Sequence, residues 1–234
     1  MLAIYRREIA AYFHTPIGYI FCAVFLALSG AVFSYTTLFS MKADVTSYFT
    51  YMLALLVILV PLLTMKLFSE ERKQKTEQLL LTAPVSLYAM VAGKLLAAYT
   101  LYAACTLLSF SSFFILYLYA EVKTAVLFGN LVAILLLGLT FITIGLFVSA
   151  LTENQLAAAI GTVAILLVLM LISLLNSLIP VYWIRFVLSS ISVFARFQNF
   201  TQGVFDIAAL FYYLSISAAF YFLTVRVFDK RRWG

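Results

Sequence analysis

Charged residues are scarce in this chain of 234 residues: 10% are Asp, Glu, Lys or Arg, whereas 65% are hydrophobic. Soluble domains carry about 25% charged and about 45–50% apolar residues. A soluble fold could not bury so large an apolar fraction. The composition therefore excludes a soluble globular domain and predicts an integral membrane protein.

Residues that bind metals or carry out catalysis are also few. Two cysteines (Cys22 and Cys105) and one histidine (His14) lie in separate parts of the sequence, without other metal-ligating side chains around them. The sequence has no G-x-x-x-x-G-K-[ST] phosphate loop, no H-E-x-x-H motif and no G-x-S-x-G motif. We expect no disulfide, no metal site, no cofactor in this chain and no catalytic residue, so the chain is not expected to be an enzyme.

Six apolar runs are each long enough to cross a membrane, because about 20 residues span roughly 30 Å of hydrocarbon. They cover residues 17–39, 48–68, 87–119, 125–151, 155–179 and 207–228. Apart from their ends, these spans contain almost no ionisable residue, whereas ion-coupled transporters tend to place such residues inside the membrane. We therefore expect one all-α transmembrane domain, residues 1–234, that draws its energy from elsewhere.

Two segments outside the spans are predicted to associate with the membrane. Residues 1–16 form an amphipathic helix, with Ile4 and Ile9 on one face and Arg6 and Arg7 on the other. Residues 180–206 are too apolar for a free loop and too interrupted to cross, which favours re-entrant helices in the outer leaflet. Asp206 is placed to cap the sixth span.

Small residues recur at helical spacing in the fourth and fifth spans: Gly138, Gly145, Ser149, Ala157 and Gly161. Small-xxx-small patterns let two helix backbones approach closely. The pattern fits packing within one subunit, which we favour, or else a seam between two subunits or the wall of a conduit.

The basic residues indicate the orientation. With the N-terminus in the cytoplasm, 11 of the 15 Lys and Arg residues fall on the cytoplasmic side. The positive-inside rule then places both termini in the cytoplasm, together with the segment between the second and third spans. The net charge of +6 is explained by this topology rather than by binding to nucleic acid.

That segment, residues 69–84 (SEERKQKTEQLLLTAP), is the only sizeable charged stretch in the sequence. Glu71 and Lys75 are four positions apart, as are Lys73 and Glu77, so opposite charges would be neighbours on a helix. Ser69 is a fair N-cap and Pro84 cannot continue the helix, which predicts one helix of about four turns.

Three stretches resemble membrane subunits of type-2 ABC exporters. EERKQKTEQLLLTAPVS (70–86), followed by GKLLA (93–97), is similar to the first cytoplasmic loop of that class, although Lys75 stands where the family often has Gly. RREIAAYFHTPIGYI (6–20) and FQNFTQGVFDIAALFYYLS (197–215), with the closing RRW, resemble the gliding-motility (GldF-like) branch.

The resemblance implies a permease subunit in the bacterial cell membrane. Segment 69–84 would be the coupling helix that contacts a separate ABC ATPase, present in two copies and carrying ATP and Mg. A second permease chain, identical or related, would complete the transporter, with room for an accessory extracytoplasmic subunit. The residues implied in ATPase coupling are Glu70, Glu71, Arg72, Lys73, Thr76, Glu77, Leu79, Leu80 and Pro84.

The expected activity is ATP-driven export of a lipid-like, peptide or polysaccharide substrate along a path formed by two permease chains. One alternative is a six-span channel or scaffold without a motor. Another is an ABC-type membrane subunit that drives a surface machine rather than moving a solute.

Overall fold

The computed structural model describes residues 1–41, 45–78, 85–119, 124–178, 183, 192–201 and 206–233. The regular secondary structure in these ranges is helical and contains no β-strand. The helices are α1 (Leu2–His14), α2 (Pro16–Phe33), the π-helix η1 (Ser34–Phe39), α3 (Val45–Thr64), α4 (Ser69–Lys73), α6 (Leu87–Phe110), α7 (Ser112–Tyr119), α8 (Thr124–Leu151), α9 (Gln155–Leu178), α11 (Val193–Thr201) and α12 (Ile207–Trp233).

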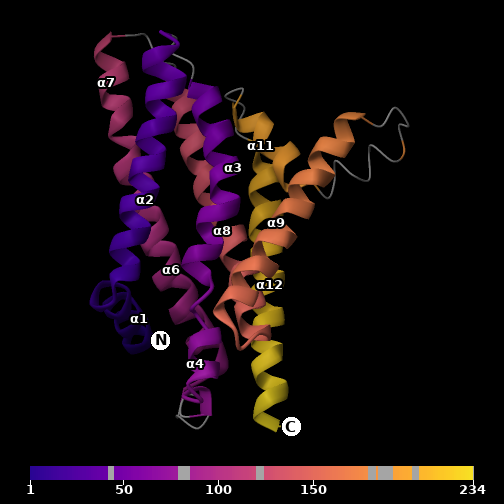
Figure 1. Ribbon diagram of the computed structural model, residues 1–234. Coiled ribbons are helices and arrows are strands. Elements are labelled where there is room, and N and C mark those ends of the chain that lie inside the picture. The colour runs from indigo at the N-terminus through magenta and orange to yellow at the C-terminus, as the bar shows by residue number, and fades with distance from the viewer. Residues whose placement is uncertain are drawn as a thin grey trace.

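Six helical stretches are long and apolar enough to cross a membrane, which confirms the predicted all-α membrane protein. They are Pro16–Phe39, Val45–Lys73, Leu87–Leu116, Thr124–Leu151, Gln155–Asn176 and Ile207–Arg232. As expected for an even number of crossings, the N-terminus and the C-terminus lie at the same end of the bundle, together with α1 and α4 (Figure 1). We call this the α4 end.

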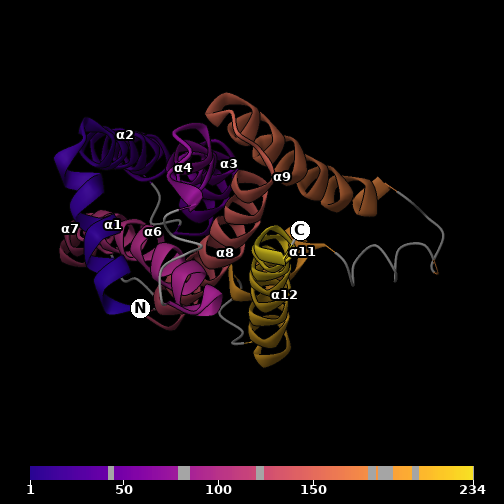
Figure 2. The ribbon, with the colours of Figure 1, turned by 90° about the horizontal axis from the view of Figure 1, so that it is seen from below.

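Helix α8 is the centre of the bundle and the most buried of the spans. It contacts α3, α6, α9, α11 and α12, and the end-on view shows it between α3, α6, α9 and α12 (Figure 2). Helix α9 leans away from the other spans at the end opposite α4 (Figure 1).

Small residues on α8 pack against neighbouring helices of the same chain. A Cβ atom at Gly138 would lie 2.1 Å from the ring of Tyr102, and one at Gly145 would lie 2.2 Å from Oγ1 of Thr64. Both glycines therefore serve close packing within one subunit, and the alternative of a seam between subunits is wrong at these two positions.

The third predicted span is not one continuous helix. α6 ends at Phe110, and α7 begins after a turn at Ser111. The hydroxyl groups of Ser109 and Ser111 donate to the carbonyl oxygens of Thr106 and Leu108, at 2.7 Å each. Such bonds between a side chain and the preceding turn compete with the helical ladder and favour a break.

Much of the predicted re-entrant segment, 180–206, lies outside the described residues. Its described part includes α11, which packs against α8, α9 and α12. The carboxylate of Asp206 accepts the N–H groups of Ala208 and Ala209 at 2.9 and 3.2 Å, so its role as the N-cap of α12 is confirmed.

The packing at Gly145 predicts a position-dependent effect of adding one methyl group. Gly145→Ala should destabilise the protein by about 1–3 kcal/mol, because the new Cβ overlaps Thr64. Gly30→Ala is the control, since a Cβ there meets nothing within 4 Å and should stabilise helix α2 by up to about 1 kcal/mol. Thermal unfolding in detergent, followed by circular dichroism, measures both; equal midpoints would contradict the packing described.

Candidate functional site

The charged segment after α3 is a short helix followed by a sharp turn. Helix α4 covers only Ser69–Lys73, and Lys75 has a φ of 58°, in the left-handed region. The N–H of Thr76 donates to the carbonyl of Glu71, and the N–H of Lys75 to that of Arg72. This is the Schellman arrangement that ends helices. The prediction of one four-turn helix over 69–84 is therefore wrong, and Lys75 adopts the bend that glycine favours.

The start of α4 is also held differently from the prediction. Ser69 is not an N-cap, because its hydroxyl bonds to the carbonyl of Met65. Instead, Ser149 of α8 accepts the N–H groups of Phe68 and Ser69 at 3.1 and 3.2 Å. The α3–α4 junction is thus fastened to the central helix by hydrogen bonds.

A cluster of four charged side chains joins α4 to α1 and α6. The Nζ of Lys94 lies 2.9 Å from Oε1 of Glu71 and 3.1 Å from Oε1 of Glu8. Arg7 Nη2 lies 2.8 Å from the same oxygen of Glu71 and 2.6 Å from that of Glu8. Two cations thus meet two carboxylates, and the cluster is neutral.

Lys94 is the most buried member, with 1% of its side chain exposed. Its third proton is accepted by the carbonyl of Leu67 at 2.7 Å, and its ammonium lies 5.1 Å from the centre of the Phe68 ring. A buried ammonium is tolerated when every proton has an acceptor and the charge is balanced. The preceding Gly93 brings α1 close, because a Cβ there would lie 3.1 Å from the side chain of Ile4.

Arg7 is held in its charged form by the same cluster. Burial alone would lower its pKa, but its hydrogen bonds and charge interactions with Glu8 and Glu71 outweigh burial, so the pKa of Arg7 is above its ordinary value. Arg7 is therefore a stable positive charge beside Glu8 and Glu71.

Two further contacts connect the charged segment to the ends of other spans. Arg72 donates to the carbonyl of Leu151 at 2.8 Å and pairs with Glu153, also at 2.8 Å. Glu77 pairs with Arg231 of α12 at 2.9 Å, and Arg231 also donates to the carbonyl of Ala150 at 2.6 Å. Residues 69–78 thus contact the α4 ends of α1, α6, α8 and α12.

The predicted coupling residues differ in what they contact. Glu71, Arg72, Thr76 and Glu77 bind within the chain, Thr76 through its hydroxyl to the carbonyl of Glu71. Glu70 faces Lys66 at 3.7 Å. Lys73 is exposed and has no ion pair with any residue the structure describes. Leu79, Leu80 and Pro84 lie outside the described residues.

Sequence reasoning missed the partners of these residues. Glu8, Lys94 and Arg231 hold the segment in place, yet none was assigned to the site. The signal for Lys94 was present, because the Gly93–Lys94 pair follows the charged segment in the stretches that resemble type-2 exporters. No local spacing links Glu8 to Lys94, since 86 positions separate them.

A cavity of about 300 Å³ lies between α3, α9 and α11. Its walls are mostly apolar, with hydroxyl groups from Thr46, Thr50, Ser173 and Thr201. Among the described residues no group of three or more His, Cys, Asp or Glu could hold a metal ion. Cys22 and Cys105 are free, and their sulfur atoms lie 3.2 Å apart.

Comparison with known protein families identifies the family of this chain. The family described as ABC-2 family transporter protein matches residues 21–233, nearly the whole chain. The chain therefore belongs to the ABC-2 transporter family. A search of curated proteins found no match. Membership makes this ABC-2 protein the membrane-spanning permease subunit of an ABC transporter, a type of subunit that is typically non-catalytic and works with an ABC ATPase in a partner chain.

The charge cluster predicts a large effect of removing one buried cation. Lys94→Met keeps the length of the side chain but leaves Glu8 and Glu71 with Arg7 alone, and should cost about 3 kcal/mol. Lys73→Met removes the same charge from an exposed position and should change stability by less than about 0.5 kcal/mol. Thermal unfolding in detergent compares the two; similar losses would argue against a structural role for the cluster.

The left-handed conformation of Lys75 predicts a stabilising substitution. Lys75→Gly should stabilise the folded protein by up to about 1 kcal/mol, because glycine adopts a positive φ without steric cost. The matched control is Gln74→Gly, one residue earlier, where φ is −84° and glycine brings only its entropic cost. Urea-unfolding midpoints separate the two variants, and a Lys75→Gly protein no more stable than Gln74→Gly would refute the turn.

Proposed function

We propose that this chain forms the transmembrane half of an ATP-driven exporter, paired with a second permease chain, and that segment 69–78 is where a separate ATPase transmits its motion. The main support for this proposal is the way the segment is held. The segment is tied to four helices by Glu71, Arg72 and Glu77, while Lys73, Gln74 and Lys75 are exposed at its tip.

The proposed orientation places the α4 end in the cytoplasm. The rule that Lys and Arg accumulate on the cytoplasmic side supports it, because Lys66, Lys73, Lys75 and the 230–232 cluster are all at this end. A cytoplasmic ATPase would then meet the tip of the segment directly, and both termini would be cytoplasmic.

The proposed coupling acts on the whole α4 end rather than on a flexible loop. ATP binding closes the two ATPase subunits on each other and displaces the tip of the segment. Because Glu71 binds α1 and α6, and Glu77 binds α12, the displacement reaches these helices together. The bundle then changes between two states whose balance is set by a ligand on the partner.

The proposed substrate is amphiphilic: lipid-like, peptide or polysaccharide. The cavity between α3, α9 and α11 supports this class, because an apolar surface with scattered hydroxyl groups suits a cargo with both apolar and hydrogen-bonding parts. Within the described residues Lys94 is the only fully buried charged side chain, and it is neutralised, which disfavours a highly charged small solute.

The second candidate is an ABC-2 subunit that drives a surface machine. The observation in its favour is the resemblance of residues 6–20 and 197–215 to the gliding-motility branch. Both candidates need the same ATPase and the same coupling segment. A channel or scaffold without a motor is disfavoured, because the family works with an ABC ATPase.

Charge reversal at the tip tests the proposal. Lys73→Glu combined with Lys75→Glu should reduce both co-purification of the ATPase and its stimulation by the permease at least fivefold, while thermal stability is unchanged. Lys230→Glu is the control, since it reverses an exposed charge at the same end of the bundle. Full ATPase binding and stimulation by the double variant would refute the assignment of the tip.

A further inference from the structure

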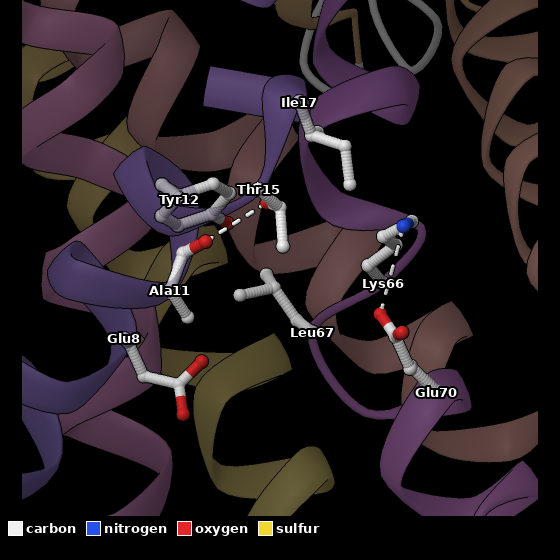
Figure 3. A pocket seen from close by; sticks show the side chains of 8 residues that line it. All are labelled: Glu8, Ala11, Tyr12, Thr15, Ile17, Lys66, Leu67 and Glu70. Carbon is white, nitrogen blue, oxygen red and sulfur yellow. Dashed lines mark hydrogen bonds and ion pairs between the residues drawn. The ribbon is translucent and has the colours of Figure 1, made fainter. Parts of the chain in front are cut away.

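A second cavity lies between α1 and the α3–α4 junction, at the ends of the first two spans. It holds about 80 Å³, several times the roughly 10–15 Å³ that one water molecule needs. Figure 3 shows Glu8 on one side of it and the Lys66–Glu70 pair on the other, with Leu67 between them. Both signs of charge therefore line one small pocket.

The pocket lies at the ends of two candidate spans, where water and hydrocarbon are expected to meet. Thr15 and Ile17 in its wall stand at the start of the first candidate span, and Lys66 and Glu70 near the end of the second. Helix α1, which supplies Glu8, is amphipathic and precedes that first span, as expected of a helix in the interface. A ligand there would have its polar part in the pocket and could keep an apolar part in the membrane.

Apolar surface continues from the pocket into the membrane region. On α3, Leu62 and Ile58 are four positions apart and share one face of the helix in the turns that precede Lys66. They are 44% and 58% exposed. On α2, Ile20 follows Ile17 by one turn and is also exposed. Acyl chains of a lipid whose headgroup occupied the pocket would lie along this surface.

The charges specify the kind of headgroup. Lys66 can donate to a phosphate, and its present partner, Glu70, is 3.7 Å away, longer than the other ion pairs at this end. The first turn of α2 adds the backbone N–H of Ile17, because Pro16 has no N–H, no side chain caps the turn, and the Thr15 hydroxyl donates to Ala11 instead. Glu8 and Glu70 can accept from a primary ammonium group. Glu70 is balanced by Lys66, and Glu8 belongs to the neutral cluster with Arg7 and Lys94. The pocket therefore has no net charge, which disfavours a headgroup that carries only negative charge.

We propose that this pocket binds the phosphoethanolamine headgroup of a membrane lipid, with the phosphate at Lys66 and the ammonium between Glu8 and Glu70. The two groups of the headgroup then match the two signs of the pocket. A phosphatidylcholine headgroup lacks N–H donors and is bulkier, and a phosphatidylglycerol headgroup lacks the cation. This binding does not depend on the proposed transport function.

Native mass spectrometry of the purified, delipidated protein tests this inference without any ATPase. With equal amounts of phosphatidylethanolamine, phosphatidylcholine and phosphatidylglycerol, we expect at least fivefold more bound phosphatidylethanolamine than either of the others. Lys66→Gln and Glu70→Gln should each reduce that preference to less than twofold. Lys73→Gln, which removes an exposed charge from α4 outside the pocket, should leave it unchanged.

Three results would overturn the proposal. Equal binding of the three lipids would show that the headgroup is not recognised. A preference that survives both Lys66→Gln and Glu70→Gln would place the lipid elsewhere. Soluble O-phosphoethanolamine that competes as well as the whole lipid would identify a free aminophosphate, rather than a membrane lipid, as the ligand.

Discussion

The α4 end depends on the neutralisation of one buried ammonium group. Moving a charged group out of water costs several kcal/mol, and the cost is offset only when the surrounding groups supply opposite charge and hydrogen bonds. Lys94 receives both from Glu8, Glu71 and the carbonyl of Leu67. These acceptors belong to α1, α4 and the α3–α4 junction. Each of these segments is therefore required for Lys94 to remain buried. If one of them moved away alone, the ammonium group of Lys94 would lose a hydrogen-bond acceptor or become exposed.

This constraint bears on the proposed role of residues 69–78 in coupling. If residues 69–78 were a solvated loop, a push on them would be absorbed by changes in backbone angles. Here Ser149 holds the beginning of the segment to α8, and Arg231 holds Glu77 to α12. A partner that displaces the tip therefore acts on the ends of several spans together. In the proposed coupling, a small movement of the tip would then favour a change of state, because packed interfaces resist continuous deformation.

The spans could be predicted from sequence because their signal is local. An apolar run of about 20 residues is sufficient evidence, and it needs no knowledge of neighbours. The same holds for Asp206, whose capping bonds reach only two and three residues ahead. The break at Ser111 was missed because a serine pair inside an apolar run carries little weight in hydropathy.

The charged segment shows where local reasoning fails. The i,i+4 pairs proposed for Glu71 and Glu77 assume that the helix continues, but it ends at Lys73, and both carboxylates bind cations from distant parts of the chain. The glycines of α8 could be recognised as packing residues, yet their partners, Tyr102 and Thr64, could not. Long-range pairing depends on how the helices are assembled, which a single sequence does not contain.

The turn at Lys75 links these observations to the proposed partner. A left-handed residue other than glycine costs roughly 1–2 kcal/mol, and Lys75 stands where the family that this segment resembles often has glycine. Among the described residues no ion pair of the Lys75 side chain offsets this cost, and the residue is exposed. What lysine adds there is a second positive charge beside Lys73, on the outward side of a segment whose acidic residues are turned inward. We propose that a tip with this charge fits an acidic surface on the partner ATPase, which would give lysine a function that glycine could not provide.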